Sequence, residues 1–167
     1  VWITTWSNLS SISKYIEAIS SLRSDYNIVV RPHPHIKHED PKNYNKLINS
    51  GFNFIDTSIE DNVQLYALAD LMLFDYGGSM FGALYLNKNF AFLDMNLESK
   101  HNKYLGELSS EDYLKSFFPD RIAKSGNLKS ICKYCLQNPP THSVMKSLRE
   151  EFFNTNYQGD SAKRAYK

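Results

Sequence analysis

The sequence has no excess of charge of either sign. Its 167 residues include 19 lysines and arginines against 18 aspartates and glutamates, so the formal net charge is +1. This balance argues against a nucleic-acid-binding protein, in which basic residues collect into a strongly positive stripe. An anion-binding site in this chain must therefore be built locally, from a few residues.

Cysteines are also scarce. The two present, Cys132 and Cys135, form one C-x-x-C pair inside a segment of helical pattern. No second cysteine pair completes a zinc site. We interpret both as reduced thiols of the core, and we expect neither a metal nor a cofactor.

Long apolar runs are absent as well. The chain begins at Val1 and contains neither a charged leader segment nor an apolar stretch long enough for a signal or membrane-spanning helix. We therefore expect a piece of a cytoplasmic protein. With 42% hydrophobic and 14% aromatic residues, the chain can bury one core, which predicts a single domain over residues 1–167.

Short apolar runs are present and recur along the chain. Their continuous character is typical of strands buried on both faces. Helical patterns separate them, and this alternation predicts an α/β fold, a Rossmann-like three-layer domain with a mainly parallel sheet of about five or six strands. The runs are Trp2–Trp6, Ile28–Val30, Phe52–Ile55, Leu71–Phe74 and Phe90–Leu93.

Several helix boundaries carry capping signals. Asp40 precedes Pro41, which predicts an N-cap and first turn for a helix over Pro41–Ile48. Asp61 with Gln64 resembles a capping box at the start of another helix. Further helical patterns cover residues 12–22, 109–118, 127–136 and 143–153, and one starts near Ser79.

Ligands of open α/β sheets bind beyond the carboxyl ends of the strands. Segment 31–35, Arg-Pro-His-Pro-His, follows the Ile28–Val30 run. Arg31 offers a fixed fork for a phosphate, and His33 or His35 can donate a hydrogen bond to a phosphate oxygen. The alternative is a surface loop with solvated histidines, in which Arg31 pairs with a carboxylate.

A second candidate is Asp75-Tyr76-Gly77-Gly78-Ser79, after the Leu71–Phe74 run. The glycines let the backbone approach an anion closely, and the following helix start offers unpaired N–H groups. Ser79 can cap that helix or bind a phosphate, and Asp75 can anchor the loop. An ordinary tight turn is the alternative.

A third candidate is Thr57 with Ser58, after the Phe52–Ile55 run. Their hydroxyl groups can reach a ribose or a phosphate. Helix capping is the alternative explanation for the same two residues.

In this order the motifs resemble the C-terminal domain of bacterial CDP-glycerol glycerophosphotransferases. The opening run and segment 158–164 extend the resemblance over nearly the whole chain. One departure is that Gly77 and Gly78 replace the two serines usual in that family, with Ser79 one place later. The matching residues are Arg31-Pro32-His33-Pro34, Asp61, Leu65-Tyr66, Ala69-Asp70, Asp75–Ser79 and Phe81.

The resemblance implies the C-terminal half of a GT-B architecture, with the donor nucleotide on this domain and the acceptor cleft against an absent N-terminal one. It implies transfer of glycerol phosphate from CDP-glycerol to a hydroxyl of a teichoic-acid or capsular polymer, with release of CMP. His33 matches a catalytic histidine assisted by Arg31. The donor-binding residues would be His35, Thr57, Ser58 and Asp75–Ser79.

The same resemblance implies partners and a location. The partners would be CDP-glycerol or a related nucleotide and a polymeric or lipid-linked acceptor. The enzyme would work at the inner face of the bacterial membrane, held there peripherally through another part of the protein.

Two other functions remain open. A GT-B glycosyltransferase that uses a sugar nucleotide needs the same diphosphate-binding loop. The second is a non-catalytic module: either a receiver-like or ligand-sensing domain, in which Asp56 or Asp75 would be the regulated acid, or a pure interaction module. Against a receiver domain, residues 4–8 offer no acidic cluster after the first strand.

Overall fold

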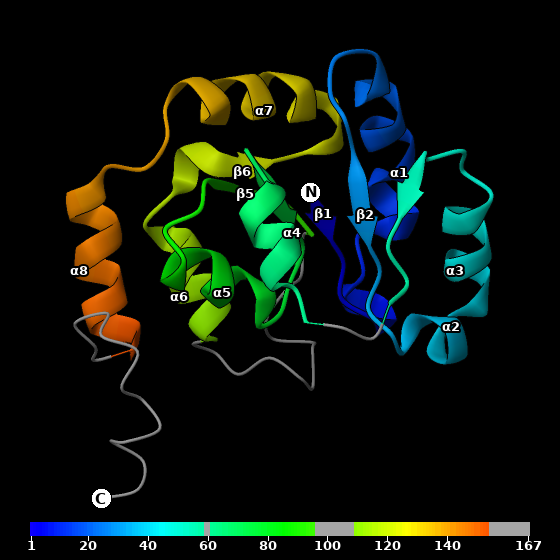
Figure 1. Cartoon of the computed structure of the whole chain (residues 1–167), viewed down its shortest axis with the longest axis horizontal. Helices are drawn as coiled ribbons and strands as arrows, with labels where there is room; N and C mark the ends of the chain where they lie inside the picture. The colour runs from blue at the N-terminus through cyan, green and yellow to red at the C-terminus, as the bar shows by residue number, and fades with distance from the viewer. Residues whose placement is uncertain (59–60, 96–108, 154–167) are drawn as a thin grey trace, which may run out of the picture.

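The computed structural model describes residues 1–58, 61–95 and 109–153. Within these ranges six strands form one sheet in the order β3-β2-β1-β4-β5-β6, and every neighbouring pair is parallel (Figure 1). The predicted α/β class with a Rossmann-like parallel sheet is confirmed. The strands are β1 (Trp2–Ile3), β2 (Val29–Arg31), β3 (Phe54–Ile55), β4 (Met72–Phe74), β5 (Phe90–Leu93) and β6 (Ile122–Ala123).

Helices cover both faces of the sheet and make three layers (Figure 1). One face packs against α1 (Ile12–Ser21), α2 (Ile36–Glu39), α3 (Pro41–Ile48) and α7 (Leu128–Gln137). The other packs against α4 (Val63–Leu68), α5 (Ser79–Tyr85), α6 (Ser110–Ser116) and α8 (His142–Phe153). Short 3-10 turns lie at Ser7–Leu9, Leu22–Ser24, Pro119–Arg121 and Ser125–Asn127. Among the described residues, no helix has the length and apolarity needed to cross a membrane.

Strands β1, β4, β5 and β6 each contribute side chains to two cores. Trp2 belongs to the core under α1 and α7, whereas Ile3 belongs to the core under α5 and α8. In β4, Leu73 faces the first core, and Met72 and Phe74 face the second. Because both faces are covered, every position of these strands is apolar, which explains the continuous runs.

The opening apolar run is mostly not a strand. Thr4 N still donates to Arg31 O of β2 at 3.0 Å, but Thr5 N donates to the Asp75 carboxylate instead of to a strand, so pairing does not continue past this point. The prediction of a strand to Trp6 is therefore wrong. Residues 4–6 instead form a loop at the carboxyl edge of the sheet.

The two helix-start predictions had different outcomes. Asp40 caps α3, since its Oδ1 accepts from Asn43 N at 3.1 Å and Pro41 is the first helical residue. The capping box at Asp61 is wrong, because α4 begins at Val63 and Asp61 Oδ1 accepts from Val63 N at 2.9 Å. Asp61 thus forms a local turn before the helix.

The sequence pattern predicts neither α2 nor β6. A two-residue strand is too short to stand out as an apolar run. Hydrogen bonds with residues distant in the sequence position β6. Asp94 N donates to Ala123 O at 2.8 Å, and the buried Arg121 donates to Asn89 Oδ1 and Phe90 O. Long-range hydrogen bonds, rather than local propensity, define this edge of the sheet.

The two cysteines are free and buried in α7, as predicted. Burial raises the pKa of the Cys132 thiol to about 11 and also raises the pKa of Cys135. Both therefore stay protonated at neutral pH. In the described ranges, no group of three or more His, Cys, Asp or Glu side chains is arranged to hold a metal ion.

The contact between α4 and α5 leaves no room at Gly82. Tyr66 of α4 is buried, and its hydroxyl donates to Ser79 O at 2.7 Å. A Cβ atom on Gly82 would lie 2.5 Å from the Tyr66 hydroxyl oxygen and 2.8 Å from Cζ. A buried, hydrogen-bonded ring cannot move aside cheaply, so this close approach requires glycine.

We expect Gly82→Ala to destabilise the protein by up to about 2 kcal/mol. Helix propensity alone would favour alanine by roughly 1 kcal/mol, but forced overlap in a packed core costs about 1–3 kcal/mol. Urea unfolding measures the difference. The matched control is Gly126→Ala, where no atom lies within 4 Å of the added Cβ. Equal loss in both variants would contradict the steric explanation.

Candidate functional site

The predicted site segments meet at the carboxyl edge of the sheet. From β1 the chain builds outward to β2 and β3 on one side, and to β4, β5 and β6 on the other. The gap between β1 and β4 is therefore the topological switch point, where open α/β sheets bind ligands. The loops after β1, β2 and β4 surround it.

Asp75 joins two of these loops. Its side chain is fully buried, and Oδ1 accepts from Thr5 N at 2.9 Å and from Tyr76 N at 2.6 Å. Oδ2 accepts from Ser11 N and Ser11 Oγ, both at 2.8 Å. The carboxylate thus ties the Gly-rich loop, residues 75–79, to the loop after β1 and to the start of α1.

Burial opposes the charge on this carboxylate. It raises the pKa of Asp75 to about 6, although the hydrogen bonds from Ser11, Tyr76 and Thr5 act in the other direction. Asp75 is therefore ionised at pH 7 and becomes protonated in mild acid. Ser11 Oγ also accepts from Trp2 Nε1 at 3.0 Å, which extends the network into the core.

The Gly-rich loop needs glycine at one of its two positions. Gly77 has φ +108°, a region that residues with a side chain rarely adopt. Gly78 has φ −61°, which any residue adopts, and no atom lies within 4 Å of the place that a Cβ would take. Neither backbone conformation nor space therefore requires glycine at this position. Gly78 is also the N-cap of α5, and Ser79 is its first helical residue. The expectation that Ser79 caps the helix is therefore wrong.

His33 lies in an aromatic cluster with Trp6 and His35. The ring centroids are 6.0 Å apart for Trp6 and His33, 5.7 Å for Trp6 and His35, and 5.1 Å for the two histidines. Trp6 belongs to the loop after β1 and directly follows Thr5, whose N–H donates to Asp75. The cluster therefore brings the loop after β2 to the switch point.

The protonation of His33 follows from its contacts. His35 N donates to His33 Nδ1 at 3.2 Å, which assigns the proton of the neutral ring to Nε2. Burial, and then the charge of His35, lower the pKa of His33. At pH 7 the ring is neutral and has one N–H, on Nε2, to donate.

Arg31 is held by the loop after β3. The guanidinium is buried, and Nη1 donates to Asp56 Oδ2 at 2.6 Å and to Ser58 Oγ at 2.7 Å. Burial alone would raise the pKa of Asp56, but hydrogen bonds from Ser58 and the charge of Arg31 bring it below its usual value. The alternative explanation of segment 31–35, a surface loop, predicts that Arg31 pairs with a carboxylate. The pair between Arg31 and Asp56 does form, but Arg31 is buried rather than at the surface.

Thr57 and Ser58 lie farther from the switch point than predicted for donor-binding residues. They follow β3, which is two strands from β1. Ser58 contacts the site through Arg31, and Thr57 is exposed. The structure thus connects His33 and His35 to residues 75–79 through Trp6 and Thr5 of the loop after β1, and it pairs Arg31 with the loop after β3.

Tyr76 points toward α6. Its hydroxyl lies 2.5 Å from Ser109 Oγ and donates to Asp112 Oδ2 at 2.9 Å. The Lys115 ammonium lies over its ring, 4.3 Å from the centroid. A pocket of about 330 Å³ opens here at the carboxyl ends of β4 and β5; it is lined by Tyr76, Leu93, Asp94, Met95, Asp112, Lys115, Ser116, Pro119 and Ile122.

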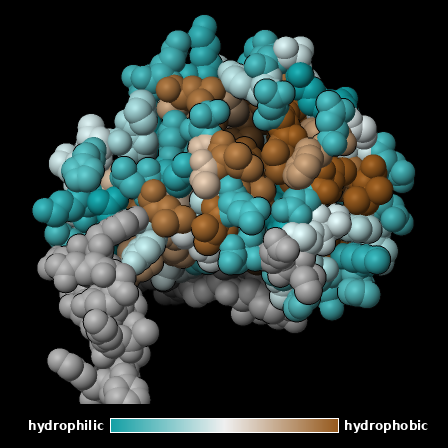
Figure 2. All heavy atoms as spheres, viewed as in Figure 1, coloured by the Kyte–Doolittle hydropathy of each residue, from teal (hydrophilic) through white to brown (hydrophobic). Residues whose placement is uncertain are grey.

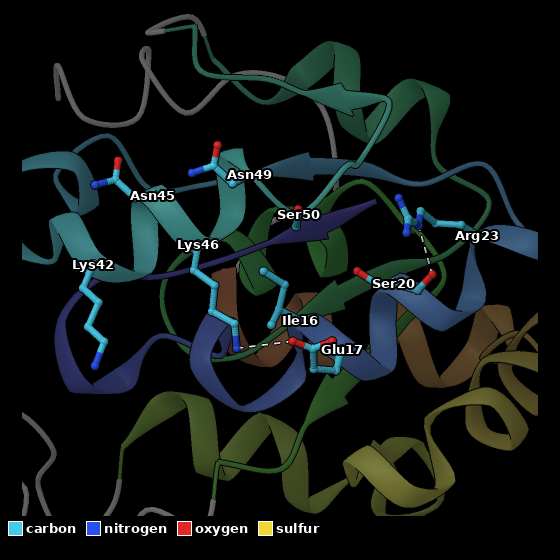
Figure 3. Close-up of a pocket in the computed structure, with 9 residues that line it drawn as sticks. All are labelled: Ile16, Glu17, Ser20, Arg23, Lys42, Asn45, Lys46, Asn49 and Ser50. Atoms are coloured by element: carbon cyan, nitrogen blue, oxygen red, sulfur yellow. Dashed lines mark hydrogen bonds and ion pairs between the residues drawn. The ribbon is translucent and has the colours of Figure 1, made fainter.

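Two further hollows contain none of the predicted site residues. One, of about 530 Å³, is an open groove between α1 and α3; in Figure 3, Lys46 reaches across it to Glu17, with Nζ 3.5 Å from Oε1. The other, of about 510 Å³, lies at the amino ends of the strands and includes Leu68 of α4. Apolar side chains gather over α4 and the strands beside it (Figure 2).

Comparisons with family models, with curated proteins and with solved structures found no match. The family resemblance therefore rests on the motifs of this sequence. Its closing segment, 158–164, lies outside the described residues.

The pH dependence of stability tests the burial of Asp75. Its pKa is about 6 in the folded chain, against an ordinary value of 3.8, so the folded state takes up a proton first as the pH falls. Relative to Asp75→Asn, the parent protein should gain about 2 kcal/mol of unfolding free energy between pH 7 and pH 4. Urea unfolding of both proteins at several pH values measures this difference. A difference that stays constant with pH would contradict the raised pKa.

Proposed function

We propose that this chain is the donor-nucleotide-binding domain of a transferase that moves glycerol phosphate from CDP-glycerol to a hydroxyl of a cell-surface polymer. The observation that supports this most directly is that the loop after β1 links His33 to the Gly-rich loop at the β1–β4 switch point. His33 contacts Trp6, and the neighbouring Thr5 bonds to Asp75. Nucleotides bind at such crevices in open α/β sheets.

Transfer of glycerol phosphate requires stabilisation of the negative charge that forms on the leaving group, CMP. The acceptor oxygen attacks the phosphorus that carries glycerol, the bond from that phosphorus to the CMP oxygen breaks, and negative charge grows on the CMP phosphate. A neutral His33 can donate its Nε2 hydrogen to that phosphate. Gly77 lets the backbone approach the diphosphate closely.

Arg31 acts in this proposal as a positioning residue. Its bonds to Asp56 and Ser58 fix the end of β2, from which segment 31–35 continues. A fixed strand end limits the positions of His33. The proton of the acceptor hydroxyl goes to a base for which we propose no residue of this chain.

We also propose that the acceptor is polymeric or lipid-linked and that the enzyme acts at the inner face of the bacterial membrane. These follow from the family resemblance of the motifs. In the described ranges, no residue is assigned to either task.

A sugar nucleotide is the second candidate donor. Gly77 and Gly78 stand where the family has serines, and a loop of glycines suits any nucleoside diphosphate. A receiver-like module has less support, because Asp75 is fully buried and Asp56 is bonded to Arg31. Neither carboxylate is presented as an acceptor of a phosphoryl group.

We expect the protein to bind CDP-glycerol in preference to UDP-N-acetylglucosamine, and His33→Ala to weaken that binding at least about tenfold. Loss of one hydrogen bond to a charged group costs about 1.5–3 kcal/mol, and about 1.4 kcal/mol is tenfold in affinity. Isothermal titration calorimetry measures both effects. The control is His38→Ala, an exposed histidine of α2, which should bind like the parent.

The outcomes separate the candidates. Preference for the UDP-sugar would move the assignment to a glycosyltransferase. Equal binding by the His33→Ala and parent proteins would remove His33 from the site. No binding of any nucleotide by the folded protein would favour an interaction module.

A further inference from the structure

Lys115 is a half-buried cation at the carboxyl edge of the sheet. Its Nζ donates to Asp75 O at 3.1 Å, at the start of the Gly-rich loop. The side chain lies against the Tyr76 ring, with Nζ 4.3 Å from the centroid, and Nζ is 5.9 Å from the Phe92 centroid. An α6 residue is thus packed directly on the loop proposed to bind the donor.

Several carboxylates lie around this ammonium, but none of those in the described ranges forms a close ion pair with it. In the part of the chain that the structure describes, no carboxylate oxygen lies within the 4.0 Å of an ion pair with Lys115. The acidic groups around it are Asp112, Asp75, Glu111 and Asp94. Burial lowers the pKa of Lys115, and these four carboxylates raise it by less.

The pocket beside Lys115 offers acceptors as well as this cation. Asp94 and Asp112 line it together with Lys115 and Tyr76. An ammonium has three hydrogens to donate, and Asp75 O accepts one of them among the described residues. The remaining N–H groups can bind an anion, and the carboxylates can accept hydrogen bonds from hydroxyl groups.

We propose that this pocket binds a phosphate ester that carries free hydroxyl groups, with Lys115 on the phosphate and Asp94 and Asp112 on the hydroxyls. The ester can be the ribose phosphate of a nucleotide or a glycerol phosphate. The choice between these sources rests on the proposed function, whereas the phosphate subsite at Lys115 does not. Lys115 is then a specificity-determining residue that the motif pattern does not contain.

Charge and size limit the ligand. A phosphate brought to Lys115 gains a charge-assisted hydrogen bond in a partly water-excluded site. A neutral nucleoside lacks this interaction, and an anion without hydroxyls donates no hydrogen bond to Asp94 or Asp112. The volume of about 330 Å³ suits one phosphorylated sugar or polyol rather than a whole nucleotide sugar.

The first experiment uses the unaltered protein. Lysines are acetylated with a limiting small reagent at neutral pH, and the rate at each lysine is read by mass spectrometry. Saturating glycerol 3-phosphate or CMP should slow acetylation of Lys115 at least fivefold. Inorganic phosphate should protect more weakly, and cytidine and glycerol should not protect. Lys133, an exposed lysine of α7, is the internal control.

The second experiment uses Lys115→Met, which keeps an unbranched side chain against Tyr76 and removes the charge. Its affinity for the protecting ester should fall at least tenfold in calorimetry, with the heat-unfolding midpoint recorded beside it. Lys133→Met is the matched control and should bind as the parent does. Raising the salt concentration should weaken binding to the parent more than to Lys115→Met.

The results distinguish this inference from the proposed function. Protection by glycerol 3-phosphate without binding of any nucleotide supports the subsite and removes the donor assignment. Stronger protection by CMP than by glycerol 3-phosphate assigns the pocket to the ribose phosphate, and the reverse order assigns it to glycerol phosphate. CDP-glycerol binding with no protection of Lys115 by any phosphate, or with full affinity in Lys115→Met, overturns the subsite and leaves the donor assignment intact. Absence of protection by every compound also overturns it.

Discussion

The buried carboxylate of Asp75 is the interaction on which the carboxyl edge of this sheet depends. A buried charge is costly unless it is fully hydrogen-bonded, and this one takes donors from Thr5, Ser11 and Tyr76. Three separate segments must therefore be in place together: the loop after β1, the start of α1 and the Gly-rich loop. The Lys115 ammonium on the Asp75 carbonyl adds α6 to this set. The geometry of the proposed site is thus a consequence of satisfying one charge.

Much of the fold can be predicted from the sequence, because the sheet is covered on both faces. Strands such as β4 and β5 are then continuous apolar runs, and a cap such as Asp40 with Pro41 has a local cause. The errors lie where long-range contacts decide. The run to Trp6 leaves the sheet because Asp75 binds Thr5 N, and β6 exists through bonds from residues about 30 positions away.

In the candidate site, too, some residues can be predicted from local sequence and others depend on long-range contacts. Segment 31–35 and the Gly-rich loop are predictable, since parallel strands place their following loops at one edge. Trp6, Ser11 and Lys115 carry no local signal that separates them from surface residues. The role of Arg31 was also not predictable from its motif: both phosphate binding and carboxylate pairing suit a guanidinium, and only the position of Asp56 beside it selects the pair.

The positions of the two tryptophans give the molecule separate optical reporters. Trp2 is wholly buried, and its indole N–H is bonded to Ser11, so its emission follows the integrity of the core and of the Asp75 network. Trp6 is half-buried against His33 and His35, so its emission follows the loop cluster. Replacing either indole by phenylalanine isolates the signal of the other. Unfolding and events at the carboxyl edge can then be followed separately in one unlabelled protein.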